Sequence, residues 1–106
     1  MNIYALSSGR GPSGIAIVRM SGKGTLQVCK NLTKLIELKS NEVNYCKFYE
    51  PNSNNIIDPE ALLLWFPAPN SYTGDDLAEF QIHGSNAVIR ALLKALSEQD
   101  NCRLAE

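Results

Sequence analysis

Residues 77–83, with the sequence LAEFQIH, alternate between apolar and polar side chains at nearly every position. The polar ones, Glu79, Gln81 and His83, all fall on one side of an extended chain. A period of two over this length is typical of a β-strand with one face on a core and one face open. The segment therefore predicts a half-buried strand and, with it, a sheet that has one polar face.

That polar face has two interpretations, and the residues alone leave both open. A carboxylate fixed on a sheet, such as Glu79, can accept two parallel N–H bonds from the edge of a heterocycle, and Gln81 can both donate and accept. The other interpretation is an ordinary solvated sheet face. His83 titrates near neutrality, but its spacing places no nucleophile or second carboxylate beside it. A structural histidine is therefore favoured over a catalytic base.

Other apolar segments predict the rest of the sheet. Each is short, rich in β-branched or aromatic residues, and bounded by Gly, Pro, Asn or Ser, as strands usually are. The predicted strands are residues 2–6, 15–20, 43–49 and 61–66, with a last strand starting at 103–105.

Two segments have helical spacing instead. Thr25 is a suitable N-cap for a helix that carries Leu26, Cys29, Leu32 and Ile36 on one face. The stretch 88–96 has a strong apolar stripe at helical period. The resulting order of elements predicts an α+β fold, a mixed β-sheet with flanking helices.

Composition narrows the class of protein. The chain has 106 residues, which is the size of one domain, and its formal net charge is −1. A sequence pI of 5.8 excludes a general basic footprint for nucleic acid. The 3 cysteines form no CxxC pair, so they predict neither a zinc ribbon nor a disulfide framework. Without a signal peptide or an apolar run near 20 residues, we expect a cytoplasmic protein with no membrane segment.

A glycine-rich segment, GRGPSG at residues 9–14, fits the spacing of a dinucleotide-binding loop. That chemistry needs a helix directly after the loop, whereas a β-branched strand follows here. Pro12 also removes an N–H that a phosphate cradle could use. We interpret the segment as a turn between two antiparallel strands. Gly22-Lys23 is followed by Gly24 and not by Ser or Thr, so it is no phosphate-binding loop either.

Arg19 lies inside an apolar strand, on the same side as Ile15 and Ile17. A guanidinium there needs a carboxylate partner because its charge is costly to desolvate. From its position a salt bridge within the protein is favoured over a bound ligand. Residues 70–76, NSYTGDD, form a polar loop whose carboxylates alone do not specify a metal. Trp65 and Tyr72 can stack on a planar ligand, and for Trp65 a place in the core is favoured.

Three stretches together resemble the MnmE (TrmE) family of tRNA-modification GTPases. They are GRGPSGIAIVRMSG at 9–22, WFPAPNSYTGDD at 65–76 and EFQIHG at 79–84. Their order and spacing agree with the family, and the resemblance covers essentially the whole chain. Two departures are Gly84-Ser85-Asn86 in place of the common Gly-Gly-Pro, and Asp75-Asp76 in place of Glu-Asp.

The resemblance implies that residues 1–106 are an N-terminal domain, similar in fold to the tetrahydrofolate-binding domain of aminomethyltransferases. It implies binding of a 5-formyltetrahydrofolate-type folate, and homodimerisation. Arg19 and Glu79 match the family's folate-contacting arginine and glutamate. The family works with a flavoprotein, MnmG, and together they modify C5 of the wobble uridine of certain tRNAs, with the folate as one-carbon source.

The family's GTPase domain, which uses GTP and potassium, would lie beyond Glu106, as would its helical domain and a third folate-contacting lysine. This chain has no phosphate-binding loop and is not expected to be catalytic by itself. Two other functions stay open. One is a free-standing one-carbon transferase of the aminomethyltransferase type, with His83 or Asp76 assisting. The other is an assembly domain without a ligand.

Overall fold

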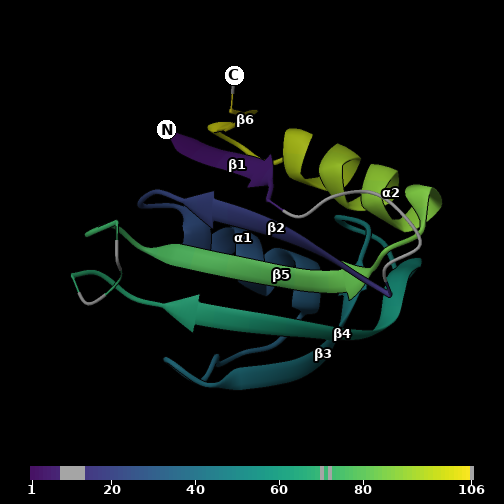
Figure 1. Ribbon diagram of the computed structural model, residues 1–106, viewed down its shortest axis with the longest axis horizontal. Coiled ribbons are helices and arrows are strands. Elements are labelled where there is room, and N and C mark those ends of the chain that lie inside the picture. Colours follow the sequence, from purple (N-terminus) through teal and green to yellow (C-terminus); the bar gives the residue numbers. More distant parts are fainter. Residues whose placement is uncertain (8–13, 70, 72, 106) are drawn as a thin grey trace.

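Six strands form one sheet in the described part of the chain, in the order β3-β4-β5-β2-β1-β6 (Figure 1). The computed structural model describes residues 1–7, 14–69, 71 and 73–105. The strands are β1 (Asn2–Leu6), β2 (Ile15–Ser21), β3 (Val43–Tyr49), β4 (Ile56–Phe66), β5 (Leu77–His83) and β6 (Cys102–Leu104), and the helices are α1 (Thr25–Thr33) and α2 (Asn86–Ser97).

The sheet is mixed. β5 is central, with antiparallel β2 on one side and antiparallel β4 on the other, whereas β1 and β6 pair in parallel. This confirms the predicted α+β class with a mixed sheet. β1 and β2 pair antiparallel, and residues 8–13, which hold most of the predicted turn, lie outside the described part.

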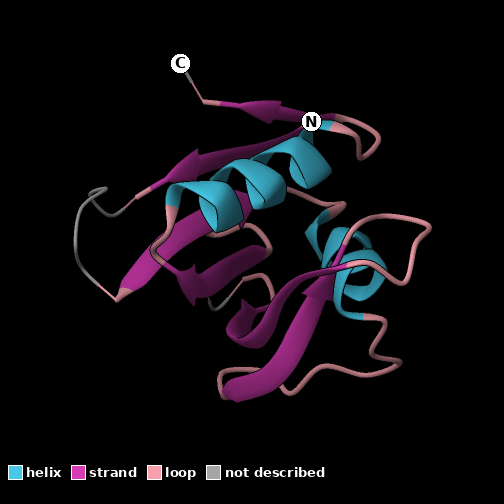
Figure 2. Ribbon diagram, turned by 90° about the vertical axis from the view of Figure 1, so that its right-hand side faces the viewer, coloured by secondary structure: helices cyan, strands magenta, loops and turns pink. Residues whose placement is uncertain are grey.

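The core lies between one face of the sheet and both helices. In Figure 1, α1 lies behind β2 and β5, and Figure 2 shows both helices (cyan) alongside the strands (magenta). Val18, Leu63 and Phe80, from three adjacent strands, are fully buried in the same cluster as Leu32 of α1 and Leu92 of α2. Because side chains alternate along a strand, the residues directly before and after each of these three face the other side of the sheet. The helices thus leave the opposite face of the central strands to carry the polar side chains.

The first helix differs from its prediction at both ends. Gly24 is the N-cap and Thr25 is the first helical residue, so the predicted capping role of Thr25 is wrong. The helix ends at Thr33 because Lys34 turns left-handed, with φ 60°, and its N–H donates to the Lys30 carbonyl. Ile36 therefore lies beyond the helix, and it is 86% exposed.

Thr25 offers a test of this end of the helix. Its hydroxyl is buried and has no hydrogen-bond partner in the described residues. Since an unpaired buried hydroxyl costs free energy, Thr25→Val is expected to raise the free energy of unfolding by about 1 kcal/mol in urea titrations. Thr33→Val is the matched control, because the buried Thr33 hydroxyl donates to the Cys29 carbonyl at 2.8 Å, and it is expected to destabilise. Equal losses of unfolding free energy in Thr25→Val and Thr33→Val would contradict the assignment of the Thr25 hydroxyl as unpaired.

β4 is longer than predicted. The sequence predicts a strand at 61–66, whereas β4 begins at Ile56 and pairs with β3 through a bulged register. The hydrogen-bonded pairing of β4 with β5 begins only at Leu62. Pro59 therefore has no β5 partner that would need the N–H that proline lacks. This extension brings Asp58 into the sheet. Within the described ranges, no helix is long and apolar enough to span a membrane.

Candidate functional site

β5 presents the predicted polar face. Ala78, Phe80 and Ile82 are buried, whereas Glu79 and Gln81 are half-buried and His83 is exposed. The alternation predicted from the sequence is therefore confirmed. The polar side chains lie on the face away from the helices.

Arg19 and Glu79 meet on this face. They are directly opposite each other in the antiparallel ladder of β2 and β5, and Arg19 Nε donates to Glu79 Oε1 at 3.0 Å. Gln81 Nε2 donates to the other carboxylate oxygen, Oε2, at 2.6 Å. The Arg19 side chain is 43% exposed and that of Glu79 is 14% exposed. The salt bridge favoured for Arg19 is thus present, with Glu79 as its partner.

These contacts hold the Glu79 carboxylate in one orientation without using up its capacity. A carboxylate has about four acceptor sites, and the described contacts of Glu79 occupy two of them. Each oxygen can therefore accept one more N–H bond. A planar group with two adjacent N–H donors would meet an acceptor that is already oriented by its neighbours.

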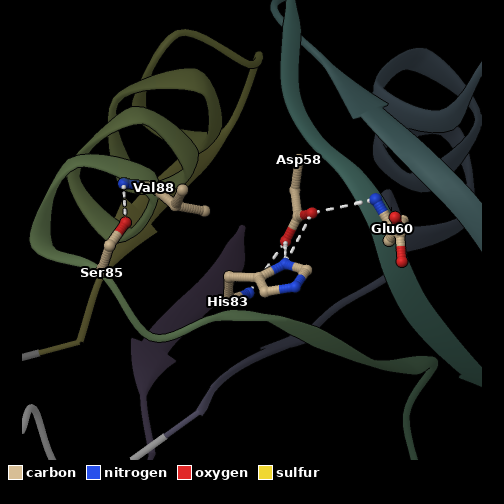
Figure 3. A network of polar contacts seen from close by, with 5 residues as sticks. All are labelled: Asp58, Glu60, His83, Ser85 and Val88. Atoms are coloured by element: carbon tan, nitrogen blue, oxygen red, sulfur yellow. Dashed lines mark hydrogen bonds and ion pairs between the residues drawn. The ribbon is translucent and has the colours of Figure 1, made fainter. Parts of the chain in front are cut away.

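At the other end of β5, His83 is paired with Asp58 of β4 (Figure 3). The Asp58 side chain is fully buried, and its two oxygens lie 2.9 Å from His83 Nδ1. The carboxylate also accepts the backbone N–H of His83 at 2.8 Å and that of Glu60 at 3.0 Å. The spacing of the sequence placed no carboxylate beside His83, because its partner Asp58 is 25 positions away. Asp58 is the residue that sequence reasoning missed.

The pair shifts both acid–base equilibria. Burial by itself would raise the pKa of the Asp58 carboxyl, but the hydrogen bonds from the His83 backbone, the His83 ring and the Glu60 backbone outweigh it and lower that pKa. The hydrogen bond to Asp58 and its negative charge raise the pKa of His83. Both shifts favour a charged pair. With Nδ1 engaged, the imidazole has Nε2 left for a ligand.

Asp76 does not join this pair. Its Oδ1 accepts the Ala68 N–H at 2.8 Å and its carbonyl accepts the Gly22 N–H at 3.0 Å. It directly precedes β5, whereas His83 ends that strand, so their Cα atoms are about 20 Å apart along an extended chain.

Other candidates from the sequence have structural roles or lie outside the described part. Trp65 is in the core, as expected. Tyr72 and residues 9–13 are outside the described ranges. The 3 cysteines are free, and no group of three His, Cys, Asp or Glu side chains suited to a metal occurs among the described residues.

An open groove of about 580 Å³ lies beside the Asp58–His83 pair. Its walls come from β3, β4 and β5 and the start of β2, including Tyr45, Lys47, Pro59, Leu62 and His83. Gln81 also lines it, whereas Arg19 and Glu79 do not. β5 therefore carries two polar features, the Arg19–Glu79 pair near its centre and the groove with His83 at its end.

Comparisons of the chain with a family model and with individual relatives point to the same family. The family model described as "GTP-binding protein TrmE N-terminus" matches residues 2–106. The chain is 53% identical over 106 residues to the tRNA modification GTPase MnmE of Pelagibacter ubique, covering 100% of the chain and 24% of that protein. It is 42% identical to MnmE of Zymomonas mobilis, covering 98% of the chain and 24% of the relative. It is 41% identical to the mitochondrial tRNA modification GTPase gtpbp3 of Dictyostelium discoideum, with 98% and 21% covered. The chain thus spans less than a quarter of the length of these relatives.

Proposed function

Because the chain belongs to the TrmE N-terminal family, we propose that it is the folate-binding and homodimerisation domain of a tRNA-modification GTPase. The folate is of the 5-formyltetrahydrofolate type, and the fold is similar to the tetrahydrofolate-binding domain of aminomethyltransferases. The observation that supports ligand binding most directly is the oriented, half-buried Glu79 carboxylate beside Arg19.

The chemistry of a pterin ring fits that carboxylate. A pterin presents a ring N–H next to an exocyclic NH₂, and one carboxylate can accept both. The remaining acceptor sites of Glu79 suit this, while Arg19 keeps the carboxylate charged and in place. Arg19 is itself 43% exposed, so its free N–H groups can also reach a polar edge or an acidic tail of the ligand.

The activity of the whole protein is part of the same proposal. Other domains would use GTP and potassium, and an MnmG-type flavoprotein would act with the protein on C5 of the wobble uridine of tRNA. The relatives named above are tRNA modification GTPases, which supports this assignment. A net charge of −1 gives this domain little electrostatic attraction for RNA, so tRNA contacts would come from the rest of the complex.

Calorimetric titration of 5-formyltetrahydrofolate into the full-length protein tests the proposal. We expect binding that Glu79→Gln weakens by about 10- to 100-fold, because a charge-assisted pair of hydrogen bonds is replaced by a neutral amide with one acceptor. Glu42→Gln removes the same charge from an exposed loop position and serves as the matched control. Unfolding curves of both variants separate lost binding from lost stability.

Two outcomes would contradict folate binding by this domain. One is the absence of binding to the full-length protein, and the other is equal affinity in the Glu79→Gln variant and the unchanged protein. If a dimer forms in sedimentation while folate has no affinity, the alternative of an assembly domain without ligand is supported instead.

A one-carbon transferase is the second candidate, and the Asp58–His83 pair is the observation that favours it. A histidine oriented by a buried carboxylate is a common general base. Transfer of a methylene group from a folate to an amine by this chain alone would support that candidate, and its loss in His83→Gln would identify the base.

A further inference from the structure

The groove beside His83 has the surfaces of a small-molecule site. Tyr45 is 82% exposed and Ile15 is 52% exposed, and both line it together with Pro59 and Leu62. Exposed aromatic and aliphatic walls around a hollow of about 580 Å³ suit a flat apolar ring. The ring of a ligand would have Tyr45 to stack on.

Charged groups stand around the same hollow. Lys47 of β3 is exposed and lines it, as does His83 of β5. Glu60 of β4 also lines it and carries the opposite charge. Together with the buried Asp58 carboxylate, which contacts His83, these groups sum to zero with His83 protonated and to −1 with His83 neutral.

The imidazole of His83 is held in one orientation, and one of its ring nitrogens is left for a ligand. The buried Asp58 carboxylate fixes Nδ1 at 2.9 Å and the His83 backbone at 2.8 Å, which orients the ring. The side chain of His83 is nevertheless 57% exposed. In Figure 3 the second ring nitrogen points away from Asp58. A protonated His83 can therefore donate from Nε2 while Asp58 balances its charge.

We propose that this groove binds an aromatic monocarboxylate, with its ring against Tyr45 and its carboxylate between Lys47 and the protonated His83. A carboxylate can accept from both the Lys47 ammonium and the Nε2–H of the protonated His83, whereas the second charge of a phosphate would meet Glu60. This groove is separate from the Arg19–Glu79 pair proposed to bind folate, because neither Arg19 nor Glu79 lines it.

Binding is expected to depend on pH through His83. The titratable and charged groups that face it are Asp58 and Glu60 from β4 and Tyr45, Cys46 and Lys47 from β3. Burial and the nearby Asp58 raise the pKa of Cys46 to about 11, so its thiol stays neutral near pH 7. Affinity should therefore be full below the pKa of His83 and fall as the pH rises through it.

The test is an NMR titration of the chain with 2-naphthoate and with its neutral counterpart, 2-naphthamide. The sequence has 1 histidine, so one imidazole signal reports on the site. We expect 2-naphthoate to bind about tenfold more tightly than 2-naphthamide at pH 6, with the preference lost above the pKa of His83. By linkage, 2-naphthoate should raise the pKa of His83.

Lys47→Met is expected to weaken 2-naphthoate binding about tenfold while sparing 2-naphthamide, since it keeps the apolar stem and removes the charge. Lys94→Met, at an exposed position of α2 outside the groove lining, is the matched control. His83→Gln should abolish the pH dependence. Equal affinity for the acid and the amide, an unshifted pKa of His83, or tighter binding of uridine 5′-monophosphate than of 2-naphthoate would each overturn the proposal.

Discussion

Phe80→Ala is expected to lower the free energy of unfolding by about 4 kcal/mol, the largest effect of any single substitution considered for this chain. Phe80 is fully buried, and its ring lies edge-on to that of Phe48, with 5.5 Å between centroids and an interplanar angle of 68°. Truncation removes this aromatic contact and leaves a cavity under β5 that rigid strands cannot refill.

Urea unfolding followed by fluorescence measures this loss, because the sequence has 1 tryptophan and Trp65 is buried in the same core. Phe80→Leu keeps most of the volume and should lose less. Ile36→Ala, at a position 86% exposed, is the control and should be close to neutral. A loss below about 1 kcal/mol in Phe80→Ala would mean that the core under β5 can collapse around the gap.

Asp58→Ala is expected to cost about 3 kcal/mol. The substitution leaves the backbone N–H groups of His83 and Glu60 without their acceptor, next to a buried space. Asp58→Asn has nearly the same shape and can still accept, so about half the loss is expected. Denaturant titrations of the three proteins at pH 6 measure both differences. Equal stability of Asp58→Asn and the unchanged protein would show that the charge has no role.

The same pair predicts how stability depends on pH. The lowered pKa of Asp58 means that its contribution is present above the carboxyl's unfolded value and is lost as the pH falls through the folded one. The raised pKa of His83 has the opposite sense. Its contribution is present below the unfolded value and is lost as the pH rises through the folded one. The pair therefore stabilises the fold most between the unfolded pKa of the Asp58 carboxyl and the unfolded pKa of His83, and Asp58→Ala should remove this dependence.

The sheet and its polar face were predictable because they depend on local pattern. Alternation in residues 77–83 depends only on the geometry of an extended chain, and it placed Glu79 and Gln81 correctly on one face. Arg19 was predicted to need a carboxylate, and Glu79 is that partner. The resemblance to the family identified the same two residues independently.

What the sequence did not show depends on contacts between distant segments. The Asp58–His83 pair joins two strands across 25 residues, and the predicted strand at 61–66 did not reach Asp58. The end of α1 was missed for another reason. The apolar spacing continues to Ile36, but the left-handed Lys34 ends the helix first, and nothing in the side chain of lysine signals that backbone conformation.

The pairing of β2 with β5 has a consequence for how the chain folds. Hairpins such as β1–β2 and β3–β4 close over short stretches of sequence, whereas Arg19 and Glu79 are 60 residues apart. Contacts of such separation form late because the entropy of closing the intervening loop must be overcome first. The Arg19–Glu79 pair lies on the seam where the two halves of the sheet join. An intermediate with both hairpins formed would still lack this ion pair, so Arg19 orients the Glu79 carboxylate only when the sheet is complete.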